Sequence, residues 1–124
     1  MIVGLDHVQI AAPPGCEEAA RAFYGELLGL AEVPKPDPLL ARGGAWFELA
    51  DSRRLHVGVE RPFAPALKAH PALRVDSRAA LEALAGELAR RGHEPRWDED
   101  LPGVTRFYVD DPFGNRVELT LGGA

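Results

Sequence analysis

The stretch FYVDDPFGNRVEL, residues 107–119, is the part of the chain that most restricts the fold. Two runs that read as strands, Thr105 to Val109 and Asn115 to Leu121, flank a segment whose proline and glycine supply the φ values of a tight turn. The spacing therefore predicts a β-hairpin. Because side chains alternate along a strand, Glu118 should lie on the face opposite its apolar neighbours.

A helix and a strand are predicted before this hairpin. Leucines at helical spacing predict a helix that begins at Asp76 or Ser77, runs to Arg91 and ends at Gly92. A strand is expected from about Ala69 to Val75, although a proline at position 71 fits a strand only at its start or edge.

The first half of the chain follows the same plan. An alternating strand is predicted from Val3 to Ala11, and a helix from about Cys16 to Leu28. The proline-rich stretch from Pro34 to about Leu40 is expected to be a loop or an edge. Gly44 to Leu49 and Arg54 to Glu60 should then form a hairpin.

The two halves correspond position by position. His7 and His70 open the halves 63 positions apart, while His56 and Glu118 lie on the last strands 62 positions apart. We therefore expect an α+β fold in one domain, residues 1–124. It would hold two βαβββ modules, about 1–61 and about 68–124, whose curved mixed sheet surrounds a pocket.

Composition narrows the classes of function. The chain has 14 Lys and Arg against 19 Asp and Glu, a net charge of −5, and no basic run, so nucleic acid is not an expected partner. No stretch has the length of a membrane span or the order of a signal peptide, so we expect a cytoplasmic protein. The single cysteine, Cys16, cannot form an internal disulfide and is interpreted as a packed apolar residue.

Four side chains could bind a metal ion. Alternation places His7, His56, His70 and Glu118 on the side of their strands away from the helices. Imidazoles with a carboxylate suit zinc, nickel, cobalt, iron or manganese and can leave coordination positions open for a substrate. Taken singly, each histidine could equally be a satisfied or exposed residue, and the glutamate could form a salt bridge. Their matching positions favour one divalent metal site.

The same face should form a polar wall that binds a small molecule. The arginines suggest an anionic or carbonyl-bearing substrate, although surface salt bridges would explain them equally well. Trp46 is interpreted as a core residue. The candidate substrate-binding residues are Gln9, Arg54, Arg74, Arg106, Tyr108 and Arg116.

Three segments resemble the vicinal oxygen chelate superfamily: LDHVQI at 5–10, AFYGELLGL at 22–30 and the stretch 107–119. That superfamily contains glyoxalase I, the fosfomycin and bleomycin resistance proteins, extradiol dioxygenases and methylmalonyl-CoA epimerase. The resemblance implies that the metal ligands lie on the first and last strand of each module. In members with three metal ligands, the ligand positions correspond to His7, His70 and Glu118. Glyoxalase-like members have a fourth ligand at the position of His56, where bacterial glyoxalase I usually has Glu.

The resemblance implies a metal-dependent lyase or isomerase of the glyoxalase type, with Glu118 as a ligand that also moves protons. Ring-cleaving dioxygenation is one alternative, and a metal-free binding protein of the bleomycin-resistance type is another. Family members often complete their sites by pairing two chains, which implies a homodimer.

Overall fold

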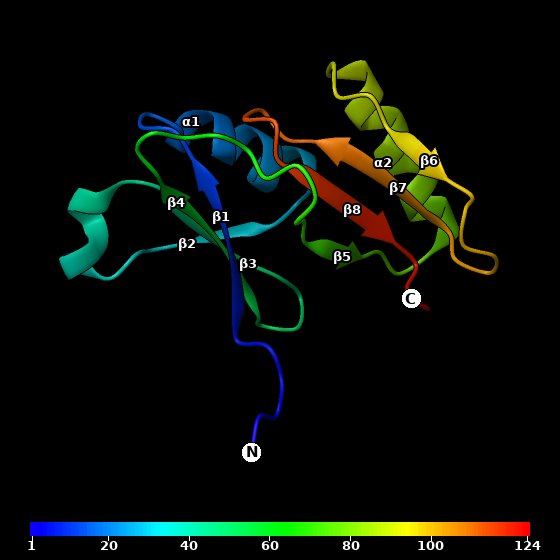
Figure 1. The fold of residues 1–124 in the computed structure, drawn as a ribbon, viewed down its shortest axis with the longest axis horizontal. Helices are drawn as coiled ribbons and strands as arrows, with labels where there is room; N and C mark the ends of the chain where they lie inside the picture. The colour runs from blue at the N-terminus through cyan, green and yellow to red at the C-terminus, as the bar shows by residue number, and fades with distance from the viewer. The chain divides into compact units, whose positions relative to one another are not determined.

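The computed structural model describes all of residues 1–124 and shows two compact units, Met1–Pro65 and Ala66–Ala124 (Figure 1). Each unit contains one four-stranded mixed sheet. No helix in the structure is long and apolar enough to cross a membrane.

The first unit begins with a strand and a helix and continues with three further strands. Its elements are β1 (His7–Ala12), α1 (Glu17–Ala20), the π-helical segment η1 (Arg21–Leu27), β2 (Ala31–Val33), the 3-10 helix η2 (Asp37–Arg42), β3 (Ala45–Glu48) and β4 (Arg54–Val59). The strand order is β1-β4-β3-β2, with β1 parallel to β4 and the other neighbours antiparallel.

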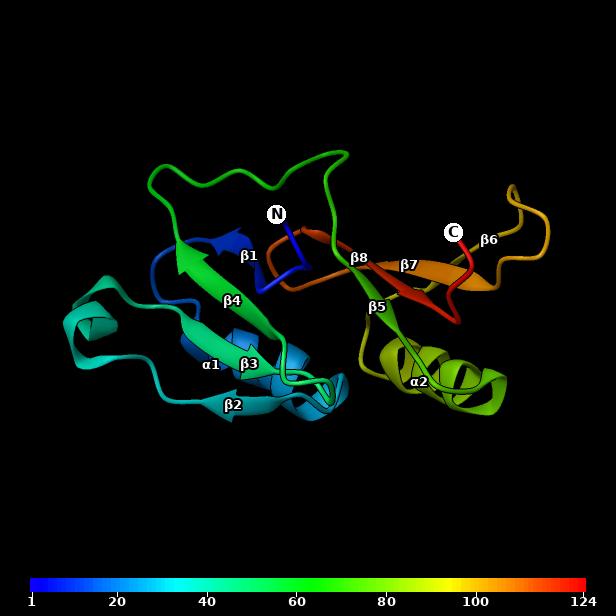
Figure 2. The ribbon, with the colours of Figure 1, turned by 90° about the horizontal axis from the view of Figure 1, so that it is seen from below.

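The second unit repeats this topology. Its elements are β5 (Ala72–Arg74), α2 (Arg78–Arg90), β6 (Arg96–Asp98), β7 (Arg106–Asp110) and β8 (Arg116–Thr120). The strand order is β5-β8-β7-β6, so the first strand again lies parallel to the last. The predicted duplication is therefore present in the strand topology. In each unit the helix lies on one side of the sheet (Figure 2).

The first helix differs from the regular α-helix that the sequence predicts. After one α-helical turn the chain continues as a π-helix, in which the Leu28 N–H donates to the Phe23 carbonyl at 2.9 Å. Phe23 and Tyr24, which are consecutive, are both almost completely buried, at 1% and 0% exposure. The wider π turn brings consecutive side chains closer to one side of the helix. Apolar spacing alone did not reveal this.

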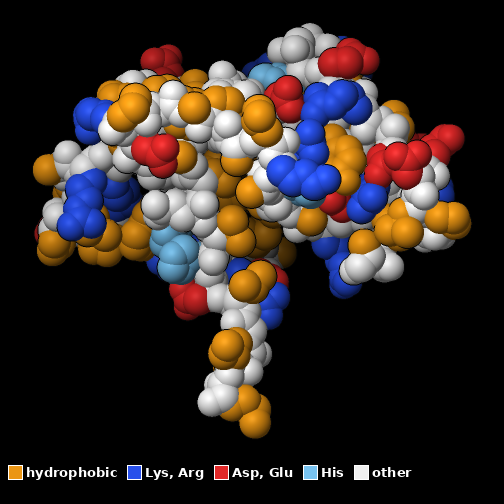
Figure 3. Space-filling view, in the orientation of Figure 1, with side chains coloured by type: hydrophobic (Ala, Val, Ile, Leu, Met, Phe, Trp, Pro, Cys, Tyr) orange, Lys and Arg blue, Asp and Glu red, His pale blue; other side chains and the backbone are white.

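The first and fifth strands are shorter than predicted. Residues 1–6 precede β1, and Met1, Ile2, Val3 and Leu5 are exposed; the segment that carries them extends at the lower edge of Figure 3. The strand predicted from Ala69 is formed only at residues 72–74, because Pro71 has no N–H to donate to a ladder. The Pro71 carbonyl still accepts the Glu118 N–H at 3.0 Å.

The second helix and the two hairpins form as predicted, within one to three residues at their ends. The Ser77 hydroxyl accepts the Ala80 N–H at 3.1 Å, which satisfies one of the free donors at the start of α2. Leu81 and Leu88 of this helix are fully buried, as are Phe107 and Val117 of the sheet. The short strand β6 was not predicted, since three residues give little periodicity.

The turn between β7 and β8 is organised by one buried carboxylate. Asp111 is 4% exposed, and its Oδ1 accepts the N–H groups of Phe113 at 2.9 Å and Asn115 at 2.8 Å. Its Oδ2 accepts the Asn115 side-chain amide at 3.0 Å. Gly114 has a φ of 88°, which favours glycine. This turn sets the register that places Glu118.

Replacing Asp111 with alanine should lower the free energy of unfolding by about 2 kcal/mol, because buried donors lose a charged acceptor. Urea denaturation would measure the loss. The control is Asp110→Ala, which removes only the exposed ion pair with Arg96 and should cost less than about 1 kcal/mol. Equal losses in the two variants would contradict this account of the turn.

Candidate functional site

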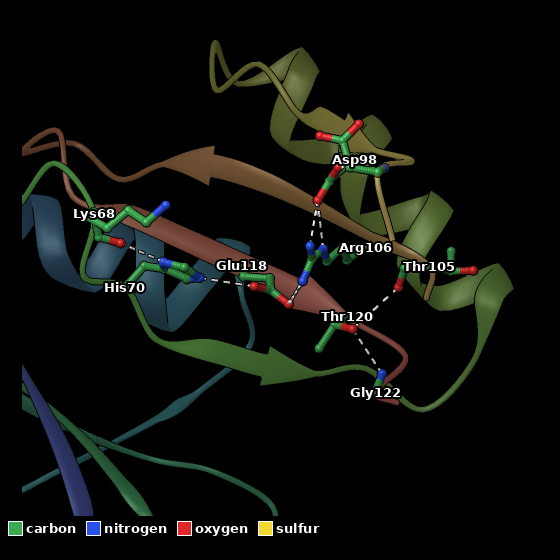
Figure 4. Close-up of polar contacts among 9 residues, drawn as sticks. Lys68, His70, Asp98, Thr105, Arg106, Glu118, Thr120 and Gly122 are labelled. Atoms are coloured by element: carbon green, nitrogen blue, oxygen red, sulfur yellow. Dashed lines mark hydrogen bonds and ion pairs between the residues drawn. The ribbon is translucent and has the colours of Figure 1, made fainter. Parts of the chain in front are cut away.

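Glu118 is the central side chain of a polar cluster in the second unit. Its side chain is only 6% exposed, on the face of β8 opposite the buried Val117 and Leu119. Its Oε1 lies 3.0 Å from the His70 Nε2, and its Oε2 lies 3.7 Å from an Arg106 nitrogen (Figure 4). Two predicted metal ligands of this unit therefore lie side by side.

The Lys68 carbonyl fixes the ring protons of His70. This carbonyl lies 2.9 Å from the His70 Nδ1 and can only accept, so Nδ1 carries the proton. The Nε2 atom faces the carboxylate of Glu118, to which it donates an N–H if the ring is protonated and presents a lone pair if the ring is neutral. With a neutral ring the two atoms, 3.0 Å apart, are both acceptors, and a metal ion between them would satisfy both. Histidines that bind metals commonly donate their second N–H to a carbonyl in this way.

Arg106 links Glu118 to a second carboxylate. One Arg106 nitrogen lies 2.7 Å from the Asp98 Oδ2, and both side chains are about six-sevenths buried, at 16% and 15% exposure. The pKa of Asp98 is lowered by the Asp100 N–H and then by Arg106, and the pKa of Arg106 is raised chiefly by Asp98. Asp98 was not singled out in the sequence, because it lies on the short strand β6.

An aromatic stack forms the corresponding part of the first unit. The His56 ring lies between the rings of Trp46, with centroids 3.9 Å apart, and His7, with centroids 4.3 Å apart. His56 is 7% exposed, and its Nε2 is buried without a hydrogen-bond partner. Burial and then the neighbouring His7 lower the pKa of His56, which favours the neutral ring.

Two sequence interpretations change here. Trp46 was expected in the core, but its ring covers His56 on the polar side of β4 and is only part-buried. Asp6, beside His7, was overlooked: its Oδ1 lies 2.7 Å from the His7 Nδ1. This contact lowers the pKa of Asp6 and leaves the His7 Nε2 as a free ligand atom.

The predicted substrate-binding residues have different surroundings. Arg54 pairs with Glu48 at 3.3 Å, and Gln9 extends over Gly58, where an added Cβ would lie 2.6 Å from its amide nitrogen. Arg106 is engaged as described. The remaining three are Arg74, Tyr108 and Arg116, all on the Glu118 side of their sheet.

The structure brings the predicted ligands together in pairs, His7 with His56 and His70 with Glu118. Neither unit by itself gathers three or more His, Cys, Asp or Glu side chains around one point. Each pair nevertheless fits a metal, since none of the three imidazoles receives a hydrogen bond at Nε2 from a protein N–H or O–H group. The four-ligand set stays a prediction.

The profile of the Glyoxalase/Bleomycin resistance protein/Dioxygenase superfamily matches residues 4–119, which is nearly the whole chain. The chain belongs to this superfamily. The resemblance stated from the three sequence segments is thereby confirmed, and the fold agrees with it. No curated protein matches the chain.

Solved structures of this superfamily are similar over nearly their full length. A glyoxalase family protein from Bacillus anthracis is 51% identical, with a TM-score of 0.89, and the match covers 97% of this chain and 95% of that one. A lactoylglutathione lyase from Agrobacterium tumefaciens is 19% identical, with a TM-score of 0.74 and coverage of 96% and 93%. A fosfomycin resistance protein from Listeria monocytogenes is 17% identical, with a TM-score of 0.80 and coverage of 99% and 94%. The last two show a shared fold only.

The buried position of Cys16 supports its interpretation as a packing residue. It is 2% exposed, and burial together with the adjacent Glu17 raises the pKa of its thiol to about 11. We therefore expect iodoacetamide to modify it slowly at pH 8 in the folded protein and rapidly in urea, as followed by mass spectrometry. Equal rates in the two states would show that the thiol is accessible and activated.

Proposed function

We propose that this superfamily member is a metal-dependent lyase or isomerase of the glyoxalase type, acting on a small substrate that binds the ion through two oxygens. Superfamily membership supports the general class, and the His70–Glu118 pair supports the metal. A homodimer and a cytoplasmic location are part of the same proposal.

The observation that carries the proposal is the buried carboxylate of Glu118 facing the His70 Nε2 atom at 3.0 Å. The Lys68 carbonyl accepts the Nδ1 proton of His70, so Nε2 is the ring nitrogen that can bind a metal ion beside the carboxylate. A divalent ion bound by both groups would resolve this arrangement.

The proposed ligands are His7, His56, His70 and Glu118. A divalent ion held by them would act as a Lewis acid on substrate oxygens. The protein's own groups have separate tasks. Asp6 and the Lys68 carbonyl each contact the Nδ1 atom of their histidine, so that the Nε2 atoms of His7 and His70 are the ones that can bind the ion, and Arg106 lies beside the Glu118 carboxylate. An ionised Glu118 can accept a proton from a carbon next to a carbonyl and return it elsewhere on the substrate.

Metal analysis of the purified full-length protein tests the proposal. After loading with Zn, Ni, Co, Mn or Fe(II) and desalting, the parent should retain about one ion per chain, and His70→Ala/Glu118→Ala should retain almost none. His7→Ala/His56→Ala should bind the ion at least about tenfold more weakly. The control is His93→Ala, which removes the one histidine outside the predicted set.

The results also separate the alternatives. A parent that retains no ion under any of these conditions would contradict the metal-dependent proposal and favour a metal-free binding protein. A metal-loaded parent that consumes oxygen with catechols would instead favour ring cleavage. Light scattering on the same samples would measure the mass and test the homodimer.

A further inference from the structure

The polar face of the second sheet contains more arginines than carboxylates. On the side of the sheet that carries Glu118, the strands present Arg96 and Asp98 from β6, Arg106, Tyr108 and Asp110 from β7, Arg116 and Glu118 from β8, and Arg74 from β5. The four arginines face three carboxylates. Basic and acidic side chains intermingle over this unit in Figure 3.

All three carboxylates of this face are already engaged. Asp110 accepts from Arg96 at 2.9 Å, and Asp98 pairs with Arg106 at 2.7 Å. The third, Glu118, lies between His70 and Arg106. No carboxylate of this sheet face therefore remains for the other two arginines.

Arg116 is the part-buried one of these two. Asp110 lies directly opposite it in the β7–β8 ladder, but the Asp110 carboxylate is turned to Arg96. The Arg116 guanidinium makes no ion pair or hydrogen bond and lies over the Tyr108 ring, 5.4 Å from its centroid. Arg74, by contrast, is exposed on the edge strand β5.

A part-buried guanidinium without a counter-ion is costly unless an anion binds there. The Tyr108 ring packs against one face of the guanidinium. The N–H groups at the edge of the guanidinium therefore stay available to donate two hydrogen bonds to a planar or tetrahedral oxyanion. Both residues line a hollow of about 570 Å³. Its acidic lining consists of Asp98, which pairs with Arg106, and of Glu99 and Asp100, neither of which forms an ion pair with Arg116.

We propose that Arg116 is a specificity-determining residue that binds a carboxylate or phosphonate group of the substrate, and this inference rests on the proposed function. Arg116 and Glu118 are two positions apart on one strand face, a separation of about 6.5 Å along the strand. The substrate is therefore a small oxyanion whose metal-chelating oxygens lie a few bonds from its charged group. Of the arginines first considered for substrate binding, the proposal assigns this role to Arg116.

Anion binding by the full-length protein tests the inference with three probes: lactate, methylphosphonate and the neutral lactamide. Titrations are followed by NMR of the labelled protein, both chelator-treated and metal-loaded. Lactate or methylphosphonate should shift the Arg116 and Tyr108 signals, whereas lactamide should not. Whichever anion binds more tightly identifies the preferred oxyanion.

Arg116→Gln should weaken binding of the preferred anion at least about tenfold, with an unchanged fold by NMR. Arg116→Lys keeps the positive charge but loses the paired N–H donors of the guanidinium, so it should weaken anion binding to an intermediate extent. This variant also tests the inference if Arg116→Gln does not fold. The control is Arg90→Gln, which removes the same charge from the exposed end of α2 and should change binding less than about twofold.

Three results would overturn the inference: Arg116→Gln binds the preferred anion as tightly as the parent, lactamide binds as tightly as lactate, or both anions have dissociation constants above about 100 mM. Its failure can be told from failure of the proposed function. Arg116-dependent binding in chelator-treated protein that never retains a metal would remove only the metal proposal. Metal retention with anion binding indifferent to Arg116 would remove only this inference.

Discussion

The buried carboxylate of Glu118 is the constraint on which the polar face of the second unit depends. A carboxylate removed from water requires cations or donors on its oxygens, and here Arg106 and the His70 ring occupy the two sides. Asp98 in turn forms an ion pair with the Arg106 guanidinium and balances its positive charge. A slip of one residue in the β7–β8 pairing would turn Glu118 into the apolar core, so the Asp111 turn protects this arrangement.

The duplicated topology produces the same position twice with different chemistry. His56 lies opposite Gln9 in the β1–β4 ladder, as Glu118 lies opposite Ala72 in the β5–β8 ladder. At the first position a neutral imidazole is held by stacking, and at the second a carboxylate is held by charge. Repetition of the backbone therefore fixes where the candidate ligands lie, while the residue type decides which forces keep them there.

On β8 the proposed tasks are divided along one face. Glu118 faces the side where a metal would bind, and Arg116, two positions earlier, faces the region of Tyr108. Separating the two tasks avoids a conflict, because an arginine placed against the carboxylate itself would compete with a metal ion. Arg106 stabilises the charge of Glu118 from a longer distance, 3.7 Å, and is restrained by its closer bond to Asp98.

The sequence by itself determined the strand faces, the second helix, the two hairpins and the duplication, because alternation, helical spacing and turn residues are local properties. It also selected His7, His56, His70 and Glu118 as candidate ligands. Only the tertiary structure decided their partners, the Lys68 carbonyl on His70 and the ring of Trp46 on His56. It also decided that Asp110 and Asp98 pair with Arg96 and Arg106 and not with Arg116. Periodicity says which side of a strand a residue faces, but neighbours from other strands decide what it meets there.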